Sequence, residues 1–231
     1  MGFAISPPPL ISLPIAGRAE RFPVHRVFCV GRNYAAHARE MGSDPEREAP
    51  FFFMKPGSAV VPVEGEVEIP YPPRTGNLQP ELELVVAIGK GGADIRADDA
   101  LGHVYGYAIG LDMTRRDLQL AAREKGRPWE FGKSFSGSAP IGPIHAAQDV
   151  GHPFQSDIVL TVNGTPRQSS NTSKLIWSVS ECLAELSRYD ALQPGDLLMT
   201  GTPEGVAAVA RGDQLRGVIS GLGEIAVRIA R

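Results

Sequence analysis

Residues 81–88, Glu-Leu-Glu-Leu-Val-Val-Ala-Ile, carry the strongest strand signal in the chain, and we expect the fold to be organised around them. Further along, residues 104–111 form a second apolar run of strand length. Near the end of the chain, residues 214–219 and 225–229 are separated by a Gly-containing turn and predict a hairpin. We therefore expect β-strands to build the core.

The composition favours the same fold class. The chain of 231 residues contains 20 Pro and 26 Gly, which leaves little room for long helices and favours strands, turns and shaped loops. Prolines in the first 20 residues exclude a helix there and predict an extended N-terminal arm over residues 1–20. We predict a mainly β (α+β) protein with one domain over residues 21–231.

Charge and hydropathy exclude several classes of function. The 23 basic and 26 acidic residues give a net charge of −3, which argues against nucleic acid as the main partner. No stretch of about 18 uncharged apolar residues exists, so we expect no membrane-spanning helix. Cys29 and Cys182 lie in apolar stretches and are expected to be buried thiols, and no secretory signal is visible. A cytoplasmic protein is the expectation.

Three helical segments are predicted. One covers residues 34–41, just after the short strand that ends at Gly31. Thr114 is the expected N-cap of a second, which ends near Gly126. The longest is expected to begin at Asn171 or Thr172, after the hairpin that the Asn-Gly pair at 163–164 predicts.

Glu81 and Glu83 are the first candidate ligands. Alternate side chains of a strand share a face, so these two carboxylates point the same way, ~7 Å apart along the chain. In so apolar a strand they need a compensating charge, and a hard cation such as Mg²⁺ or Mn²⁺ can supply it. The alternative is an exposed edge strand with solvated glutamates.

A second stretch of alternating glutamates differs from the pair Glu81 and Glu83 in the residues around it. Glu64, Glu66 and Glu68 also alternate, but only Val67 and Ile69 accompany them before the next proline. This pattern predicts a solvated edge strand. The sustained apolar run after Glu83 is what separates the two cases.

Asp112 is the third candidate ligand. It ends a strand face that is almost bare of side chains, so that another layer can approach closely; the residues before it on this face are Val104, Gly106, Ala108 and Gly110. Three carboxylates from two strands suit an octahedral cation that keeps positions open for substrate. On spacing alone, Asp112 could equally cap the turn before Thr114.

Two further features could carry chemistry. His37 and Glu40 stand three residues apart, so on a helix they can touch, and a carboxylate that orients an imidazole makes a general base near neutral pH. A weak surface salt bridge is the alternative. Lys133, beside small residues, could bind an oxyanion or be a solvated lysine, and the turn at 200–205 could hold a carboxylate.

Taken together, the ordered segments resemble the fumarylacetoacetate hydrolase family, and within it the short acylpyruvate and fumarylpyruvate hydrolases. The resemblance covers about residues 25–231. Its segments are Val-Gly-Arg-Asn-Tyr-Ala-Ala-His-Ala-Arg-Glu-Met (30–41), Phe-Met-Lys-Pro (53–56), Glu-Leu-Glu-Leu (81–84), Gly-Leu-Asp-Met-Thr-Arg-Arg-Asp-Leu-Gln (110–119), Gly-Lys-Ser-Phe (132–135), Val-Asn-Gly (162–164) and Thr-Gly-Thr-Pro-Glu-Gly-Val (200–206). Seven motifs in order are a specific signal, although any one alone would not be.

The resemblance implies a mixed β-sandwich roll that forms a homodimer, with residues 21–231 as the catalytic domain. By position, Glu81, Glu83 and Asp112 would bind Mg²⁺ or Mn²⁺. His37 and Glu40 would activate water from a lid segment.

Three more side chains and one turn complete the implied site. Lys133 would contact the developing enolate or the oxo group of the substrate. Gln119 would help place the water, and Arg116 with the turn at Gly201 and Thr202 would meet a carboxylate. Loops 43–50 and 123–130 are expected to shape the pocket for the distal group of the substrate.

The implied reaction is metal-dependent hydrolysis of a C–C bond in a 2,4-dioxo acid, such as fumarylpyruvate giving fumarate and pyruvate, in the breakdown of aromatic compounds. Oxaloacetate decarboxylation, or isomerisation of a related 2-oxo dioic acid, is the alternative, because the same electron sink serves it without attack by water. A non-catalytic ligand-binding module is a third possibility, which predicts no turnover of any 2-oxo acid.

Overall fold

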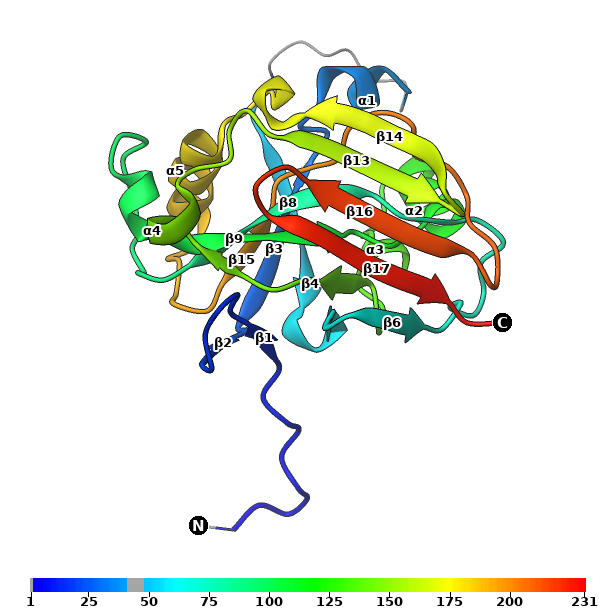
Figure 1. Ribbon diagram of the computed structural model, residues 1–231, viewed down its shortest axis with the longest axis horizontal. Coiled ribbons are helices and arrows are strands. Elements are labelled where there is room, and N and C mark those ends of the chain that lie inside the picture. Colours follow the sequence, from blue (N-terminus) through cyan, green and yellow to red (C-terminus); the bar gives the residue numbers. More distant parts are fainter. Residues whose placement is uncertain (1, 41–47) are drawn as a thin grey trace.

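The computed structural model describes residues 2–40 and 48–231, and two β-sheets dominate it (Figure 1). The larger sheet has eight strands. Its order is β4 (Phe51–Pro56), β3 (Arg26–Gly31), β15 (Leu197–Met199), β8 (Leu82–Ile88), β9 (Val104–Leu111), β11 (Ala139–Ile141) and β5 (Val60–Pro62), with β12 (His145–Ala146) also paired to β9. The strands predicted at 81–88 and 104–111 are therefore the centre of this sheet.

The smaller sheet has five strands and contains the two predicted hairpins. Its order is β14 (Thr165–Asn171), β13 (Asp157–Val162), β16 (Gln214–Ile219), β17 (Gly223–Ile229) and β6 (Glu66–Ile69). Two short ribbons pair β1 (Ser12–Pro14) with β2 (Arg21–Pro23) and β7 (Leu78–Gln79) with β10 (Thr114–Arg115). Parallel pairs (β3 with β15, β5 with β11, β6 with β17) occur among antiparallel ones, so the predicted mixed β-sandwich is confirmed.

The two sheets pack face to face, with the five-stranded sheet lying across the larger one (Figure 1). Leu82, Leu84 and Val86 of β8 belong to the apolar core between the sheets, whereas Val85 and Ala87 belong to a second core on the opposite face of the larger sheet. Strand β8 is thus buried on both faces, which explains its continuous apolar sequence.

The bare face of β9 does permit close approach. A Cβ atom built on Gly106 would lie 2.3 Å from the carbonyl oxygen of His145, and one built on Gly110 would lie 2.6 Å from Cγ2 of Val85. Neither contact is possible for a real side chain, so both positions require glycine.

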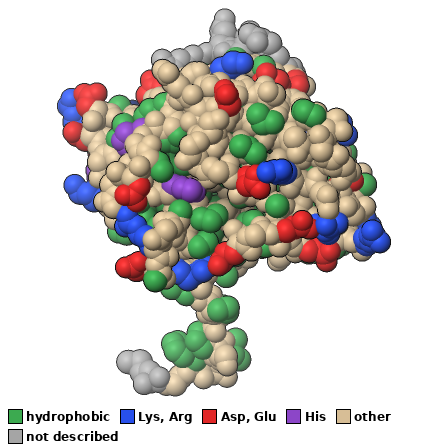
Figure 2. Space-filling view, viewed as in Figure 1, with side chains coloured by type: hydrophobic (Ala, Val, Ile, Leu, Met, Phe, Trp, Pro, Cys, Tyr) green, Lys and Arg blue, Asp and Glu red, His purple; other side chains and the backbone are tan. Residues whose placement is uncertain are grey.

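The N-terminal arm is shorter than expected. Residues 2–10 are exposed, and Figure 2 shows hydrophobic side chains along the segment that projects from the body. Leu13 and Ile15, however, are buried in the second core, and β1 pairs with β2. Apolar residues placed between the prolines anchor residues 11–15, which the proline count alone does not reveal.

Helices are few and short. They are α1 (Ala35–Glu40), α2 (Arg116–Glu124), α3 (Glu130–Lys133), α4 (Ala147–Val150) and α5 (Val179–Tyr189), with 3₁₀ turns at Gly57–Ala59, Ala100–His103 and Thr172–Lys174. The helix predicted at 34–41 corresponds to α1, and its last residue lies outside the described residues. No helix within the described part of the chain has the length and apolar character needed to span a bilayer.

Two predicted helix starts are wrong. Thr114 lies in β10, its hydroxyl donates to the carbonyl oxygen of Asp112 (3.2 Å), and α2 begins only at Arg116. Pairing of β10 with β7 keeps Thr114 extended and so overrides its capping preference.

The longest helix, α5, begins later than predicted. Asn171 caps the short 3₁₀ turn instead, where its side chain accepts the N–H of Ser173. The cap of α5 is Ser178, which forms a reciprocal capping box with Glu181. The Ser-x-x-Glu spacing at 178–181 was available in the sequence, but the apolar residues before it suggested an earlier start.

Candidate active site

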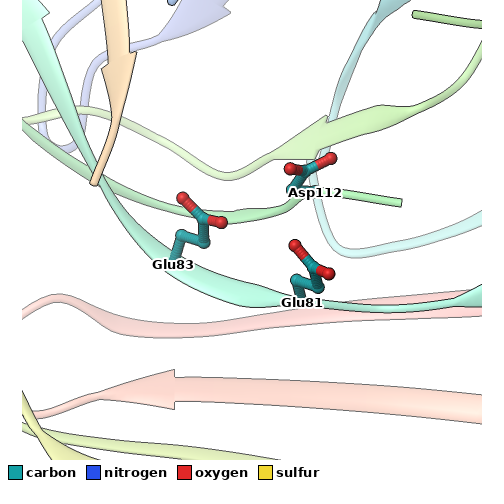
Figure 3. Close-up of side chains that lie close together, drawn as sticks. All are labelled: Glu81, Glu83 and Asp112. Carbon is teal, nitrogen blue, oxygen red and sulfur yellow. The ribbon is translucent and has the colours of Figure 1, made fainter. Parts of the chain in front are cut away.

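Three buried carboxylates form the centre of the candidate site (Figure 3). Glu81 immediately precedes β8, Glu83 lies within it opposite Gly110 of β9, and Asp112 follows β9. The antiparallel register brings the three together, and the N–H of Asp112 donates to the carbonyl oxygen of Glu81 (2.8 Å). One oxygen from each carboxylate lies within 4.8 Å of the others, and each residue is at most 4 % exposed.

Basic side chains surround these carboxylates. Nζ of Lys133 lies 2.8 Å from Oε2 of Glu81 and 2.6 Å from Oδ2 of Asp112. Lys55 reaches Oδ1 of Asp112 at 2.8 Å, and Arg116 forms a hydrogen-bonded ion pair with Glu81. All three basic residues are nearly or fully buried. Asp112 is therefore part of this cluster, and it does not cap the turn before Thr114.

The electrostatic balance differs between the two glutamates. Burial raises the pKa of Glu81, but the charges of Lys133 and Arg116 outweigh burial and bring the pKa below its usual range. For Glu83, burial and the charges of Asp112 and Glu81 act together, so its pKa lies well above the usual range. Glu83 is thus a buried carboxylate next to two others, and only the backbone N–H of Gly201 donates to it (2.7 Å) among the described contacts.

A divalent cation fits this arrangement. The donor set consists of carboxylate oxygens alone, which hard cations such as Mg²⁺ and Mn²⁺ prefer. Positive charge at the centre of the cluster would also offset the repulsion that raises the pKa of Glu83. The three carboxylates can therefore hold such an ion.

His37 and Glu40 meet on α1, as their spacing predicts. Nδ1 of His37 lies 3.5 Å from Oε2 of Glu40, and the Glu40 carboxylate also accepts the N–H of Gly205 (3.0 Å to Oε1). His37 is 6 % exposed, and burial is the main reason why its pKa lies below the usual imidazole value. The charge of Glu81 acts in the opposite direction and that of Arg116 in the same one. A buried imidazole with a low pKa is neutral at pH 7 and can accept a proton.

Gln119 and Arg116 lie on the first turn of α2 and face the same space. Nε of Arg116 donates to Oε1 of Gln79 (2.7 Å), and another nitrogen of its guanidinium donates to Oε1 of Gln119. Together with the ion pair to Glu81, these bonds commit the guanidinium to protein partners. Arg116 therefore fixes both Gln119 and Glu81.

One cavity unites the predicted residues. Its lining includes all of them except Glu40, which is exposed and contacts His37 from a neighbouring pocket. The predicted residues in the lining are His37, Glu81, Glu83, Asp112, Arg116, Gln119, Lys133, Gly201 and Thr202. Arg123 and Trp129, from the segment predicted as loop 123–130, also line it, although Arg123 lies in the last turn of α2. Most of loop 43–50 lies outside the described residues.

The sequence itself matches a known family over nearly its whole length. The family described as fumarylacetoacetate (FAA) hydrolase C-terminal matches residues 26–230. The chain belongs to the fumarylacetoacetate hydrolase family. This confirms the resemblance that the seven ordered motifs indicated.

Individual relatives of this family member point to two activities. A fumarylpyruvate hydrolase of a Ralstonia species is 50 % identical over 186 residues, which cover 80 % of this chain and 95 % of the relative. A crystal structure of fumarylpyruvate hydrolase from Pseudomonas aeruginosa in complex with Mn²⁺ and pyruvate superposes with a TM-score of 0.97, at 58 % identity, and covers 99 % of both chains. The mitochondrial oxaloacetate tautomerase of Homo sapiens is 39 % identical over 205 residues, covering 89 % of this chain and 91 % of the relative.

In this fumarylacetoacetate hydrolase family member, the turn after β15 is hydrogen-bonded to β8, the strand that carries the candidate ligand Glu83. The N–H of Gly201 donates to Glu83, and the hydroxyl of Thr202 donates to the carbonyl oxygen of Leu82 (2.9 Å). Gly201 has φ +98°, and a Cβ atom there would lie 2.8 Å from Cβ of Asn33, so the position requires glycine. These contacts within the chain secure Glu83 and β8, and a contact of these two residues with a substrate carboxylate stays a prediction.

Three supporting residues were missed by sequence reasoning. Lys55 is fully buried and donates to the carbonyl oxygens of Met113 (3.3 Å) and Lys133 as well as contacting Asp112. Its position in Phe-Phe-Phe-Met-Lys, a lysine directly after four large apolar residues, was a usable signal.

The other two missed residues are amides. Asn33 donates to the carbonyl oxygens of Trp177 and Thr200 (both 2.9 Å). Gln168 accepts the N–H of Leu82 (3.0 Å) and donates to the hydroxyl of Thr202 (2.8 Å). Both connect segments more than 80 residues apart in the chain, and nothing local in the sequence indicates such partners.

Proposed function

We propose that this protein hydrolyses a C–C bond of an acylpyruvate, and that its substrate is fumarylpyruvate, which gives fumarate and pyruvate. The observation that carries the proposal is the buried His37, paired with the exposed Glu40, in the wall of the cavity that three carboxylates and Lys133 also line. The similarity to two fumarylpyruvate hydrolases, at 50 % and 58 % identity, supports the choice of substrate.

In this proposal Glu81, Glu83 and Asp112 hold Mg²⁺ or Mn²⁺. When bound, the ion supplies a Lewis acid that binds the 2-oxo acid end of the substrate and stabilises negative charge there. Lys133, held by Glu81 and Asp112, places a second positive charge at the same end of the cavity. Arg116, Gly201 and Thr202 bound this end, and the protein contacts described above fix their positions.

His37 is the proposed general base. Glu40 interacts with Nδ1, which leaves Nε2 as the nitrogen that takes a proton from water. Gln119, fixed by Arg116, orients that water toward the distal carbonyl carbon of the substrate. Attack forms a C–O bond, and the C–C bond between this carbon and the neighbouring methylene then breaks. The electron pair of that bond becomes the enolate of pyruvate, which Lys133 stabilises until a proton completes the product.

Action on oxaloacetate is the second candidate. The observation that favours it is the 39 % identity to the human oxaloacetate tautomerase over nine-tenths of both chains. Decarboxylation or isomerisation of a 2-oxo dioic acid uses the same enolate stabilisation but needs no attack by water. Such a reaction therefore depends on Lys133 and the carboxylates more than on a water-activating base.

The two candidates are separated by following the ultraviolet absorbance of fumarylpyruvate, acetylpyruvate and oxaloacetate with Mg²⁺, Mn²⁺ or EDTA. We expect the highest kcat/KM with fumarylpyruvate and its loss in EDTA. For His37→Gln we expect hydrolysis to fall by about 10²- to 10⁴-fold. Hydrolysis by this variant at near wild-type rate would refute the base, and a higher kcat/KM for oxaloacetate than for either acylpyruvate would favour the second candidate.

We further propose that the enzyme acts as a homodimer in the cytoplasm. The family resemblance supports the dimer, and the two buried free cysteines are consistent with a reducing compartment. Light scattering coupled to gel filtration measures the mass directly. A mass of one chain, 24.7 kDa, at micromolar concentration would contradict the dimer.

A further inference from the structure

The cavity of the candidate site changes character from its inner end to its rim. At the inner end lie the three carboxylates and Lys133, all at most 4 % exposed. The rim is formed by partly exposed residues, which are Arg32, Phe51, Arg123 and Trp129. A substrate whose 2-oxo acid lies at the inner end therefore extends its acyl chain toward two arginines.

The basic groups of the inner end are already engaged. Lys133 and Lys55 contact Asp112, and Arg116 is bonded to Glu81, Gln119 and Gln79. A second carboxylate at the far end of a substrate cannot rely on these groups, because each would first have to release a buried, oppositely charged or hydrogen-bonded partner.

Arg32 differs from them. Within residues 2–40 and 48–231 no carboxylate lies at ion-pair distance from it, and its guanidinium sits over the ring of Phe51, 5.5 Å from the centroid. Burial lowers the pKa of Arg32, the charge of Arg123 lowers it further, and Glu48 acts the other way. The positive charges of the two arginines repel each other on the wall of one cavity, and an anion bound between them would offset this repulsion.

The backbone holds Arg32 in this position at some cost. Its φ is +56°, a left-handed conformation that residues other than glycine, asparagine and aspartate rarely adopt. A Cβ atom on the preceding residue, Gly31, would lie 2.0 Å from Cζ of Phe51, so a larger residue there would displace this ring. Phe51 also meets Trp129 edge to face, with ring centroids 5.6 Å apart. The rim is thus an aromatic wall with a guanidinium fixed against it.

We propose that Arg32 and Arg123 bind the distal carboxylate of the substrate, and so make the enzyme selective for 2,4-dioxo acids that carry a second carboxylate at the end of the acyl chain. The proposal rests on the hydrolase function proposed above and names its substrate class. Guanidinium groups present paired N–H donors that match the two oxygens of a carboxylate. Phe51 and Trp129 offer flat apolar contact to the unsaturated chain between the two ends of such a substrate.

The test compares fumarylpyruvate, which has the distal carboxylate, with acetylpyruvate, which ends in a methyl group. Arg32→Gln and Arg123→Gln should each lower kcat/KM for fumarylpyruvate by about 10- to 100-fold, mainly through KM. For acetylpyruvate the fall should be about 3-fold or less. Arg123→Lys, which keeps the charge but not the paired donors, should lie between wild type and Arg123→Gln.

Arg127→Gln is the matched control, because Arg127 is exposed, lies four residues beyond Arg123 and is not part of the cavity wall. It should leave both substrates unaffected. Equal losses of activity on both substrates, or no loss on fumarylpyruvate, would overturn the proposal even if wild-type hydrolysis is fast.

A binding measurement separates this proposal from the hydrolase function. Calorimetry of the Mn²⁺-loaded enzyme with fumarate and with pyruvate needs no turnover. We expect Arg32→Gln and Arg123→Gln to weaken fumarate binding by about 10-fold and to leave pyruvate binding within about 2-fold. Absence of turnover in the wild type would refute the hydrolase function, whereas unchanged fumarate binding in both variants would refute the role of the arginines.

Discussion

Two stretches of alternating glutamates end in opposite environments. Glu66 and Glu68 lie on β6, the edge strand of the smaller sheet, and both are exposed. Glu81 and Glu83 lie at β8, between β15 and β9 in the larger sheet, and are at most 4 % exposed. The same Glu-x-Glu spacing therefore gives a solvated edge in one sheet and the centre of a candidate metal site in the other. The residues after each pair decide the outcome, since only Glu83 leads into a long apolar run.

The surroundings of the two pairs explain what each can do. Arg228 on the neighbouring strand β17 approaches Glu66 to 2.7 Å, a partly exposed ion pair that water screens. Water does not screen Glu83 in this way, because the residue is buried. Burial and two neighbouring carboxylates raise its pKa. Buried carboxylates that lie close together and repel one another lower the stability of the fold, but the same arrangement favours binding of a cation.

The largest contrast is expected for neutral substitutions at the two pairs. Glu83→Gln should remove a ligand and lower kcat/KM by roughly 10³-fold, equivalent to about 4 kcal/mol, whereas Glu68→Gln should change it by less than about 2-fold. The same Glu83→Gln variant, stripped of metal, should unfold at a higher temperature than the stripped wild type, because a repelled buried charge is gone.

Calorimetric titration with Mn²⁺ and thermal melting in EDTA check both parts. Loss of Mn²⁺ binding together with a raised melting temperature in EDTA is the expected combination for Glu83→Gln. Unchanged Mn²⁺ affinity would show that the carboxylate is not a ligand. A comparable loss of activity in Glu68→Gln would break the distinction between the two strands.

The next largest effect concerns the lysine that neutralises the site. Lys55→Met should lower the free energy of unfolding by about 3 kcal/mol, because it leaves the buried Asp112 carboxylate with Lys133 as its remaining close cation. Urea titration followed by circular dichroism measures this in EDTA and with Mn²⁺. Mn²⁺ should restore part of the loss, because the ion binds beside Asp112; a variant as stable as the wild type would contradict a structural role for Lys55.

How much of this could be predicted from the sequence depends on how local each signal is. Apolar residues over a strand's length predict strands β8, β9 and β13 from the sequence. The different environments of Glu66 and Glu83 could also be predicted from the residues next to each in the chain. Partners distant along the chain left no local trace. Asn33, 167 residues from Thr200, is an example.

The candidate site shows the same limit. Individual residues such as Asp112 were as consistent with a turn cap as with a ligand, and only the ordered motifs of a family placed them in one site. Thr114 and Asn171 were assigned caps by a sound local rule, but strand pairing of β10 and a short 3₁₀ turn took those positions. At both positions the helix-capping preference of the residue was overridden by the contacts that the folded chain forms there.

A moderate effect of pH on kcat/KM is expected, because it depends on protonation of His37 in the buried site and not on the exposed glutamates of β6. Burial lowers the pKa of His37, and a general base must be unprotonated, so kcat/KM should be flat at neutral pH. It should fall about tenfold per pH unit once the pH drops below the pKa of His37, which lies below the usual imidazole value near 6.5. A pH–rate profile of kcat/KM for acetylpyruvate measures this limb. If the rate already fell between pH 8 and 7, the base would be another group.

The smallest effect is expected where the exposed pair is disrupted. Glu66→Gln removes one partner of Arg228 on the edge strand, and partly exposed ion pairs of this kind contribute at most about 1 kcal/mol. The loss should therefore be a few tenths of a kcal/mol at low salt and vanish in about 1 M NaCl, because salt screens exposed charges. Urea titration at both salt concentrations tests it, with Lys55→Met as the buried counterpart, whose loss should persist in salt. If the two variants showed the same salt dependence, burial would not be what distinguishes the acidic residues of β6 from those of β8.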